Sequence, residues 1–279
     1  MSYLEQHLVE WRPAPWTQYD TISAEQVAAL SAVLDQPATA ADGDPLPPLW
    51  HWLYFLEWPA EADLGADGHP NTGHFLPPIP DRRRMFAGGR LQIQRPLTIG
   101  QQTTRVSSLA NSVVKQGRSG ELAFVTIRSE LCQSGETRAV EELDFVYRSG
   151  AGASPSFSRT PAPAPPSTAA WQLRPRISPM TLFRFSALTA NAHRIHYDAP
   201  YAHETEGYPG LVVHGPLLAV LMLELVRCND PRAVAAISFR LRRPVFLGDG
   251  ILVHGGRDGG LVVATAADDS HATAEVRFR

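Results

Sequence analysis

Three histidines and an asparagine lie close together in the C-terminal part of this chain, in a polar stretch whose residue types suit acid–base chemistry. Asn191, His193 and His196 fall within six residues, and His214 follows about twenty residues later. Directly after His214 comes a run that is apolar almost throughout. An amide and two imidazoles in a polar loop, followed by a histidine at the start of an apolar helix, predict an active site. An imidazole suits such a site because it changes its charge near neutral pH.

The apolar run predicts a buried helix that fixes the geometry of this site. Pro216 suits the first helical turn, and Gly215 before it lets another group approach the backbone closely. Between Leu217 and Val226 the only ionisable side chain is Glu224, and a helix that is apolar on nearly all sides is buried. Its free N-terminal amides would stabilise a developing oxyanion. The N–H of Gly215 is the candidate donor.

The polar loop resembles the motif S-G-D-x-N-P-x-H of the MaoC-like (R)-enoyl-CoA hydratases, which is followed by H-G-M-L. The matching positions are Thr189, Ala190, Asn191, His193, Arg194 and His196, then His214 to Leu217. Residues 239–249 resemble the strand F-x-x-P-V-x-x-G-D of the same family. The family's catalytic Asp is Asn191 here, a variant similar to the hydroxyacyl-thioester dehydratase type 2 branch, which includes mesaconyl-C4-CoA and itaconyl-CoA hydratases. The likeness is specific over 176–250 and weaker over 66–148.

The resemblance implies a cofactor-free hydro-lyase that interconverts enoyl and 3-hydroxyacyl thioesters, with coenzyme A present only as part of the substrate. The implied acyl group is short and dicarboxylic, such as itaconyl-CoA or mesaconyl-C4-CoA giving citramalyl-CoA in itaconate degradation. Hydration needs a base, an acid and donors to the thioester oxygen. We expect His196 to be the general acid/base. Asn191 would orient the water and the imidazole, because an amide cannot accept a proton as a base. His193 and His214 are candidate substrate-binding residues, with structural roles equally open.

Two other classes of function remain open at this point. A thioesterase would need a carboxylate near the helix, and Asp198 and Glu224 are the candidates. A non-catalytic acyl-thioester binder would explain the loss of the motif's Asp, but it has no need of a titrating imidazole. We expect no metal, because the spacing of His193, His196, His203 and His214 fits no standard ligand pattern.

Composition narrows the classes of partner and location that the chain can have. The chain has 279 residues, a net charge of -3 and a pI near 6.4, which favours neither nucleic acid nor a membrane surface. It contains no apolar run long enough to span a bilayer. Two cysteines are too few for a disulfide framework, and residues 1–12 lack the pattern of a signal peptide. We therefore expect a cytoplasmic protein with a small-molecule acyl-CoA partner, and a homodimer of such chains is a further possibility.

Residues 149–170 contain five prolines and one charge and predict an extended linker. They separate an N-terminal half, 1–148, from a C-terminal half, 171–279. The two halves resemble each other, since Arg95 to Gly100 matches Arg243 to Gly248 and Pro48-Leu49 predicts the start of an apolar helix as Pro216-Leu217 does. Alternating β-branched and aromatic residues predict strands. Their expected ranges are 90–95, 101–116, 120–134 and 137–148, then 234–243, 249–257 and 259–279. The predicted class is α+β, a double hotdog whose halves form a pseudo-dimer.

The N-terminal half has no counterpart of Asn191 or His196, so we expect one catalytic site, with this half forming a wall of the acyl pocket. Its segment 23–34 predicts a helix with a capping box formed by Ser23 and Gln26. Residues 64–90 predict a long loop, either a solvated linker or a lid. As a lid it would bring Arg84 or Arg90 to a substrate carboxylate. Arg240 and Arg242 lie on one strand face and would meet either the coenzyme A phosphates or solvent.

Overall fold

The computed structural model describes residues 2–117, 120–150, 163–266 and 270–279. Most of the predicted linker, residues 151–162, lies outside this described part. The N-terminal half contains α1 Tyr3–Leu8, β1 Trp16–Thr21, α2 Ala24–Val33, η1 Trp50–Leu53, η2 Glu61–Asp63, β2 Arg83–Ile93, β3 Gln102–Gly117, β4 Gly120–Gln133 and β5 Glu136–Arg148. The C-terminal half contains β6 Trp171–Leu173, α3 Pro179–Leu188, η3 Arg194–His196, η4 Tyr201–Thr205, α4 Gly215–Asn229, β7 Val234–Leu241, β8 Leu252–Gly255, β9 Gly260–Ala264 and β10 Ala272–Phe278.

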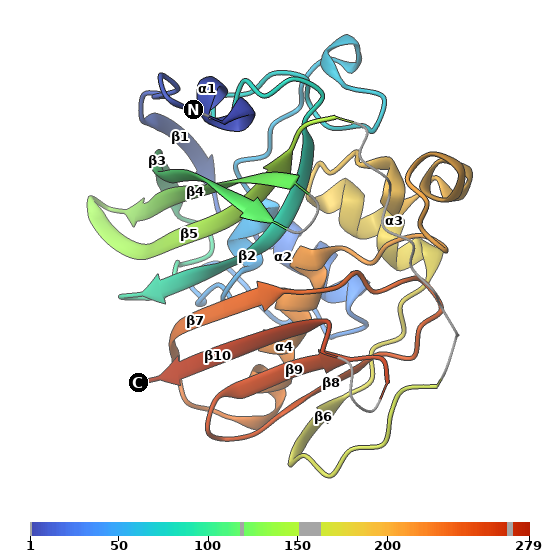
Figure 1. Ribbon diagram of the computed structural model, residues 1–279. Helices are drawn as coiled ribbons and strands as arrows, with labels where there is room; N and C mark the ends of the chain where they lie inside the picture. Colours follow the sequence, from blue (N-terminus) through green and yellow to red (C-terminus); the bar gives the residue numbers. More distant parts are fainter. Residues whose placement is uncertain (1, 118–119, 151–162, 267–269) are drawn as a thin grey trace.

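All ten strands form one antiparallel sheet in which the two halves mirror each other. The order is β1-β3-β4-β5-β2-β7-β10-β9-β8-β6. In each half the first strand lies at the outer edge, the second lies at the centre, and the third, fourth and fifth lie between them. The halves meet where β2 pairs with β7, with Leu91 opposite Ile237. Figure 1 shows the green strands of one half continuing into the red strands of the other. This mirrored sheet is the double hotdog that the sequence predicts.

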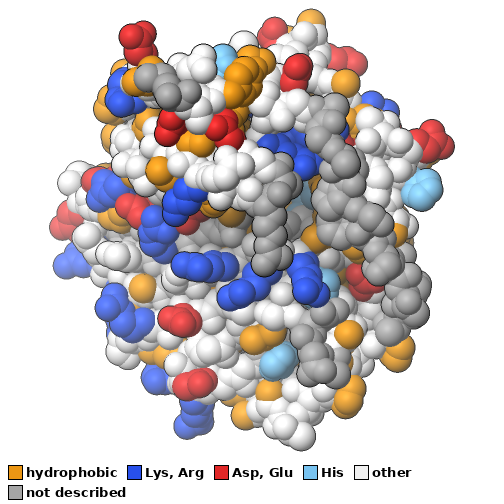
Figure 2. All heavy atoms as spheres, in the orientation of Figure 1, with side chains coloured by type: hydrophobic (Ala, Val, Ile, Leu, Met, Phe, Trp, Pro, Cys, Tyr) orange, Lys and Arg blue, Asp and Glu red, His pale blue; other side chains and the backbone are white. Residues whose placement is uncertain are grey.

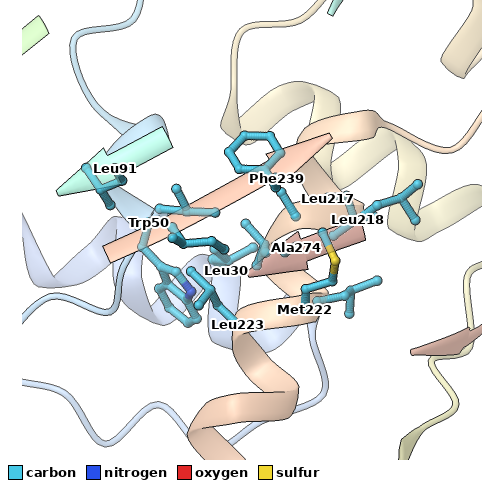
Figure 3. Packing of buried hydrophobic residues seen from close by; sticks show 14 of the residues in the cluster. Leu30, Trp50, Leu91, Leu217, Leu218, Met222, Leu223, Phe239 and Ala274 are labelled. Atoms are coloured by element: carbon cyan, nitrogen blue, oxygen red, sulfur yellow. The ribbon is translucent and has the colours of Figure 1, made fainter. Parts of the chain in front are cut away.

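The core lies between the sheet and the buried helix α4, as the apolar run predicts. Every residue from Leu217 to Val226 is buried, and α4 packs against strands of its own half. The same cluster extends across the junction to residues of the N-terminal half such as Leu30, Trp50 and Leu91 (Figure 3). The halves therefore share one core. Among the described residues, no helix combines the length and apolar character needed to cross a membrane.

Several local predictions for the N-terminal half are wrong. The apolar helix expected from Pro48 is a single 3-10 turn, η1, because Leu49 adopts a left-handed φ of 69° directly before it. Helix α2 forms over the expected range, but Ser23 makes no side-chain capping bond. Arg84 and Arg90, expected in a loop, lie on β2, which starts at Arg83 because it pairs with β5 from there and with β7 from Gly88 on.

In the C-terminal half, the single strand expected over 259–279 is two strands, β9 and β10, which pair with each other. The short edge strands β1 and β6 were not predicted. They are short, and their pairing partners, β3 and β8, lie far along the chain.

Candidate active site

The polar loop is held in shape by its own backbone and by Asn191. Helix α3 ends at Leu188, and Ala190 then adopts a left-handed φ of 48°. The backbone N–H of Asn191 donates to the carbonyl of Ser186 at 2.9 Å. The side-chain oxygen of Asn191 accepts a hydrogen bond from the backbone N–H of His193 at 3.0 Å. Asn191 therefore orients the backbone that carries His193.

His196 lies in η3 and is buried, with 7% of its surface exposed. Its Nδ1 lies 2.8 Å from the carbonyl oxygen of Val212. A carbonyl can only accept a hydrogen bond, so Nδ1 carries the proton and Nε2 is left as the free acceptor. Burial lowers the pKa of His196 to about 4, outweighing the opposite effect of the Val212 carbonyl, and the nearby His69 lowers it further. The ring is thus a neutral imidazole with a fixed tautomer at neutral pH.

His214, directly before α4, lies beneath His196 rather than at a pocket mouth. The two rings stack with centroids 3.7 Å apart at 18°, and His214 is fully buried. Its Nε2 lies 2.8 Å from the hydroxyl of Ser186, and its buried Nδ1 has no hydrogen-bond partner in the described part of the chain. Burial, and then the neighbouring histidines, hold the pKa of His214 well below its usual value. His214 supports the ring of His196, and no surface of it is open to a substrate.

Two residues that sequence reasoning missed, Asp67 and His69, complete the histidine cluster. Both come from the segment between η2 and β2 in the N-terminal half. Asp67 accepts two hydrogen bonds from His69, one from its ring Nδ1 and one from its backbone N–H, each 2.9 Å long. The His69 ring lies 4.0 Å from that of His193, which is 5.5 Å from that of His196. The signal in the sequence was an acidic residue and a histidine, separated by one glycine, in a segment too long for a simple connection.

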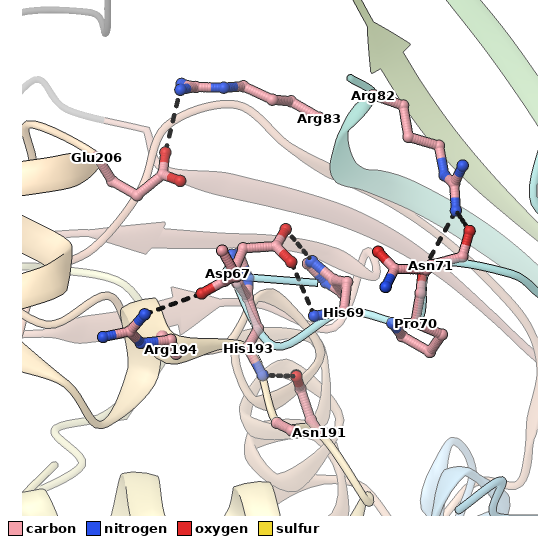
Figure 4. A network of polar contacts seen from close by, with 12 residues as sticks. Asp67, His69, Pro70, Asn71, Arg82, Arg83, Asn191, His193, Arg194 and Glu206 are labelled. Carbon is pink, nitrogen blue, oxygen red and sulfur yellow. Dashed lines mark hydrogen bonds and ion pairs between the residues drawn. The ribbon is translucent and has the colours of Figure 1, made fainter. Parts of the chain in front are cut away.

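The segment that carries Asp67 is fixed tightly to the loop that carries His193. The backbone N–H of Arg194 donates to the Asp67 carbonyl, and its Nη1 donates to the Ala66 carbonyl, both at 2.9 Å (Figure 4). Gly68, at φ +87°, sits so close that a Cβ there would lie 1.9 Å from the carbonyl oxygen of Ala192. Only glycine allows this approach. The contact joins residues more than 120 positions apart in the sequence.

Burial keeps the imidazoles of the cluster neutral, and hydrogen bonds from His69 keep the Asp67 carboxylate ionised. Burial lowers the pKa of His193 to about 2, and the neighbouring histidines act in the same direction. Burial and the charge of Arg84 lower the pKa of His69, against the effect of Asp67. Burial acts to raise the pKa of Asp67, but the hydrogen bonds from His69 outweigh it and leave the pKa well below its usual value.

The same three residues have the spacing of a cation site, since possible ligand atoms of Asp67, His69 and His193 lie within 4.8 Å of one another. Two of those residues are already joined, because Nδ1 of His69 donates to Asp67. The hydrogen bond gives Asp67 a role without a cation. The expectation that the chain needs no metal stays a prediction.

The two arginines proposed to bind a substrate carboxylate occupy different faces of β2. Arg84 hydrogen-bonds Tyr147, and its charge acts on both His69 and His193. Arg90 is exposed and forms ion pairs with Glu142 at 2.6 Å and Asp144 at 2.9 Å. Of the two, Arg84 lies beside the histidine cluster, whereas Arg90 already has two carboxylate partners on the solvent face.

Arg240 and Arg242 are both exposed. Arg240 alternates with the buried Ile237 and Phe239 along β7, so it lies on the solvent face of the sheet. Figure 2 shows basic side chains gathered over the region where β2 lies beside β7. Solvent exposure is compatible with binding phosphates and with solvation alone, so the coenzyme A role stays a prediction.

Gly215 lies at the N-terminus of α4, as the sequence predicts, and its role as a donor to an oxyanion stays a prediction. Gly215 is the first residue of the helix, where a backbone N–H has no intrahelical acceptor. A Cβ on Gly215 would lie 2.4 Å from Leu241 and 3.6 Å from Phe86. Apolar side chains therefore fill the space that a side chain at residue 215 would occupy.

The two carboxylates considered for a thioesterase both have other partners. Asp198 accepts from Arg194 at 2.7 Å and from the backbone of Tyr201 at 3.1 Å. Glu224 is buried and accepts from Trp50, Gln36 and Arg227. At 1.5 Å per residue it lies about 13 Å along the helix from Gly215. Glu224 is therefore too far along the helix to activate water at the start of α4, and Asp198 is already held by Arg194 and Tyr201.

Comparison with known proteins identifies relatives over most of the chain. The family described as hydroxyacyl-thioester dehydratase type 2 matches residues 49–247. The chain is 49% identical over 228 residues to a mesaconyl-C(4)-CoA hydratase of Chloroflexus aurantiacus, covering 81% of each. It is 29% identical to the mitochondrial hydroxyacyl-thioester dehydratase type 2 of Schizosaccharomyces pombe, covering 72% of this chain and 75% of that protein.

Solved structures show the same fold at low sequence identity. HtdX of Mycobacterium tuberculosis superposes with a TM-score of 0.63 at 20% identity, covering 95% of this chain and all of that one. A MaoC-like dehydratase superposes with a TM-score of 0.68 at 14% identity, covering 99% and 100%. These likenesses confirm the fold alone.

Proposed function

We propose that this chain adds water to a short dicarboxylic enoyl-CoA. The chain belongs to the hydroxyacyl-thioester dehydratase type 2 family of hydro-lyases, and this membership supports the proposal. Mesaconyl-C4-CoA is the first candidate substrate, because this chain is 49% identical over 228 residues to the mesaconyl-C(4)-CoA hydratase of Chloroflexus aurantiacus. The product would be citramalyl-CoA, and the reaction would need no cofactor beyond the coenzyme A of the substrate. The cytoplasmic location and the pairing of two chains, both expected from the sequence, stay predictions.

The observation that carries this proposal is the fixed tautomer of His196. Its Nδ1 donates to Val212, so Nε2 is free to take a proton and return it. Hydration transfers one proton from water to the α-carbon while the oxygen of water bonds to the β-carbon. His196 is the general acid/base, Asn191 holds the adjoining backbone, and the Gly215 amide stabilises the enolate oxygen. His193 lines the same cluster, and His214 holds His196 from below.

The chemistry of mesaconyl-C4-CoA also supports a role for Arg84. In this molecule the free carboxylate is attached to the β-carbon, which is the carbon that water attacks. A cation that binds the carboxylate must therefore lie within a few Å of the proton-transfer groups. Arg84 is the candidate for this cation, because its charge lowers the pKa of both His69 and His193. A guanidinium is well suited to a carboxylate because it donates two parallel hydrogen bonds.

The test is hydration of crotonyl-CoA, mesaconyl-C4-CoA and itaconyl-CoA, followed by enoyl-thioester absorbance and free thiol together. We expect loss of the double bond without thiol release, fastest on a dicarboxylic substrate. His196→Ala should lower kcat by a factor of about 10² to 10⁴. Release of thiol by the wild type would instead show a thioesterase.

Arg84→Gln separates substrate recognition from catalysis. It should lower kcat/KM for mesaconyl-C4-CoA by at least about tenfold, which corresponds to about 1.4 kcal/mol, and leave crotonyl-CoA nearly unchanged. Arg90→Gln is the matched control, because Arg90 is on the same strand but pairs with Glu142 and Asp144. Equal losses on both substrates would show that Arg84 does not read the second carboxylate.

A further inference from the structure

The site lacks a carboxylate where the family motif has one. At residue 191 an amide occupies the position of the catalytic Asp, and its oxygen is used by the backbone of His193. An amide cannot take a proton from water. If His196 acted alone, one imidazole would have to reach both the attacking water and the α-carbon.

The N-terminal half brings a carboxylate to the same place by another route. Asp67 is fixed by two hydrogen bonds from His69, and the His69 ring lies against that of His193. An ionised carboxylate only accepts, so Nδ1 of His69 carries the proton and Nε2 is the free nitrogen. A carboxylate behind an imidazole fixes its tautomer and stabilises the imidazolium that forms when it takes a proton.

We propose that Asp67 and His69 form a second proton-transfer pair in this site, which replaces the carboxylate missing at residue 191. His69 is the catalytic residue of the pair, and Asp67 is its positioning residue. The inference rests on the proposed hydration, and it assigns the two proton-transfer roles to two imidazoles from different halves of the chain.

The proton balance closes within the cluster. An O–H bond of water breaks as Nε2 of His69 takes the proton, the water oxygen bonds to the β-carbon, and the π electrons of the double bond shift towards the thioester. This proton must then reach Nε2 of His196, and the His193 ring lies between the two imidazoles, with its centroid 4.0 Å from that of His69 and 5.5 Å from that of His196. From Nε2 of His196 the proton forms the new C–H bond at the α-carbon. Every imidazole ends neutral, as it began, and no other reactant is required.

The structure holds this pair in place with specific contacts. Gly68 lies between the two residues and packs against Ala192, while Arg194 bonds the carbonyls of Ala66 and Asp67. The His69 side chain is only 17% exposed. A segment that only linked η2 to β2 would not need a glycine at van der Waals contact with the catalytic loop.

The experiment compares Asp67→Asn and His69→Gln with Asp63→Asn. Asp63 lies in the same segment, is exposed, and bonds Asn71 only through its backbone carbonyl. We expect kcat on the substrate that the wild type hydrates to fall by about 10² or more in His69→Gln and Asp67→Asn. KM should change less than threefold, and Asp63→Asn should match the wild type. Because Asp67 acts to raise the pKa of His69, its loss should also move the acid limb of kcat to lower pH.

Three measurements keep this proposal separate from the proposed function. Titration of the histidine ring protons by NMR needs no substrate and should show a lower pKa for His69 in Asp67→Asn. Hydration abolished by His196→Ala but kept within threefold by His69→Gln and Asp67→Asn would overturn the pair while leaving the function intact. Loss of wild-type activity on chelation, with recovery in Zn²⁺, would also overturn it, because the three residues would then bind a metal.

Discussion

The two halves of the molecule follow the same order of elements but differ at the central helix. In the C-terminal half α4 runs for 15 residues, whereas the corresponding element of the N-terminal half, η1, has four. The difference has a local cause and a tertiary one. Leu49 takes a left-handed backbone conformation that does not continue into a helix. The space a second long helix would occupy is already filled, because Trp50 of η1 packs into the core with α4.

Because of this asymmetry, the two halves contribute different residues to the candidate active site. The C-terminal half keeps the buried helix, with His214 at its start and His196 stacked on His214. The N-terminal half has exchanged its helix for a turn and a long segment, and that segment delivers Asp67 and His69. A histidine also lies in η1, but His51 is joined to the buried Glu141 at 2.9 Å. In the N-terminal half the described residues therefore offer His69, rather than His51, as the imidazole beside the polar loop.

The largest effect on stability should come from cutting the tie between the halves at Glu224. This buried carboxylate of α4 accepts hydrogen bonds from Trp50 at 3.1 Å and Gln36 at 2.9 Å in the other half, and it pairs with Arg227. Glu224→Ala leaves the buried indole N–H without an acceptor, so we expect a loss of about 3 kcal/mol. Urea unfolding measures it.

Glu275→Ala is the control for this variant, because Glu275 is exposed on β10 and should change the free energy of unfolding by no more than about 0.5 kcal/mol. A loss below about 1 kcal/mol in Glu224→Ala would show that the shared core and the pairing of β2 with β7 join the halves without help from Glu224.

The next effect is the pH dependence of stability that arises from His196 in the C-terminal half. His196 has its pKa lowered to about 4 in the folded protein by burial, against about 6.5 when unfolded. The unfolded chain thus binds more protons between these values, and stability is complete above pH 6.5 and is lost as the pH falls towards 4. From pH 7 to pH 5 this one group should cost about 2 kcal/mol.

Urea unfolding at pH 7 and pH 5 tests this expectation in the wild type and in His196→Gln. The other neutral histidines of the cluster act in the same direction, so the difference between the two proteins isolates His196. If the variant lost as much stability as the wild type, the imidazole of His196 would have to be freely protonated in the folded state.

The elements that the sequence predicted are those whose signals are local. Helix α4 and strands β3 to β5 carry strong apolar patterns, and they form close to the expected positions. The polar loop was found through its motif, and it does bring His193 and His196 together. The predicted helix at Pro48 was wrong because a repeat in sequence does not reveal that the partner half already fills the space.

Asp67 and His69 could not be placed from the sequence, because their position depends on a contact with a loop more than 120 residues away. Nothing in the local pattern of residues 64–82 distinguishes a docked segment from a solvated one. The glycine between the two residues becomes informative only when its close approach to Ala192 is seen. For the same reason, Arg84 and Arg90 looked equivalent until the faces of β2 were known.

The smallest effect should appear at the starts of α2 and α3, which occupy equivalent places in the two halves and both follow a serine. Ser178 forms a capping box, since its hydroxyl accepts from the backbone of Thr181 and the Thr181 hydroxyl accepts from the backbone of Ser178, both at 3.2 Å. Ser23 makes no such bond. Ser178→Ala should therefore cost about 1 kcal/mol, and Ser23→Ala less than about 0.5 kcal/mol. Equal losses in urea unfolding would mean that Ser23 caps α2 in solution, and that the halves begin their helices in the same way.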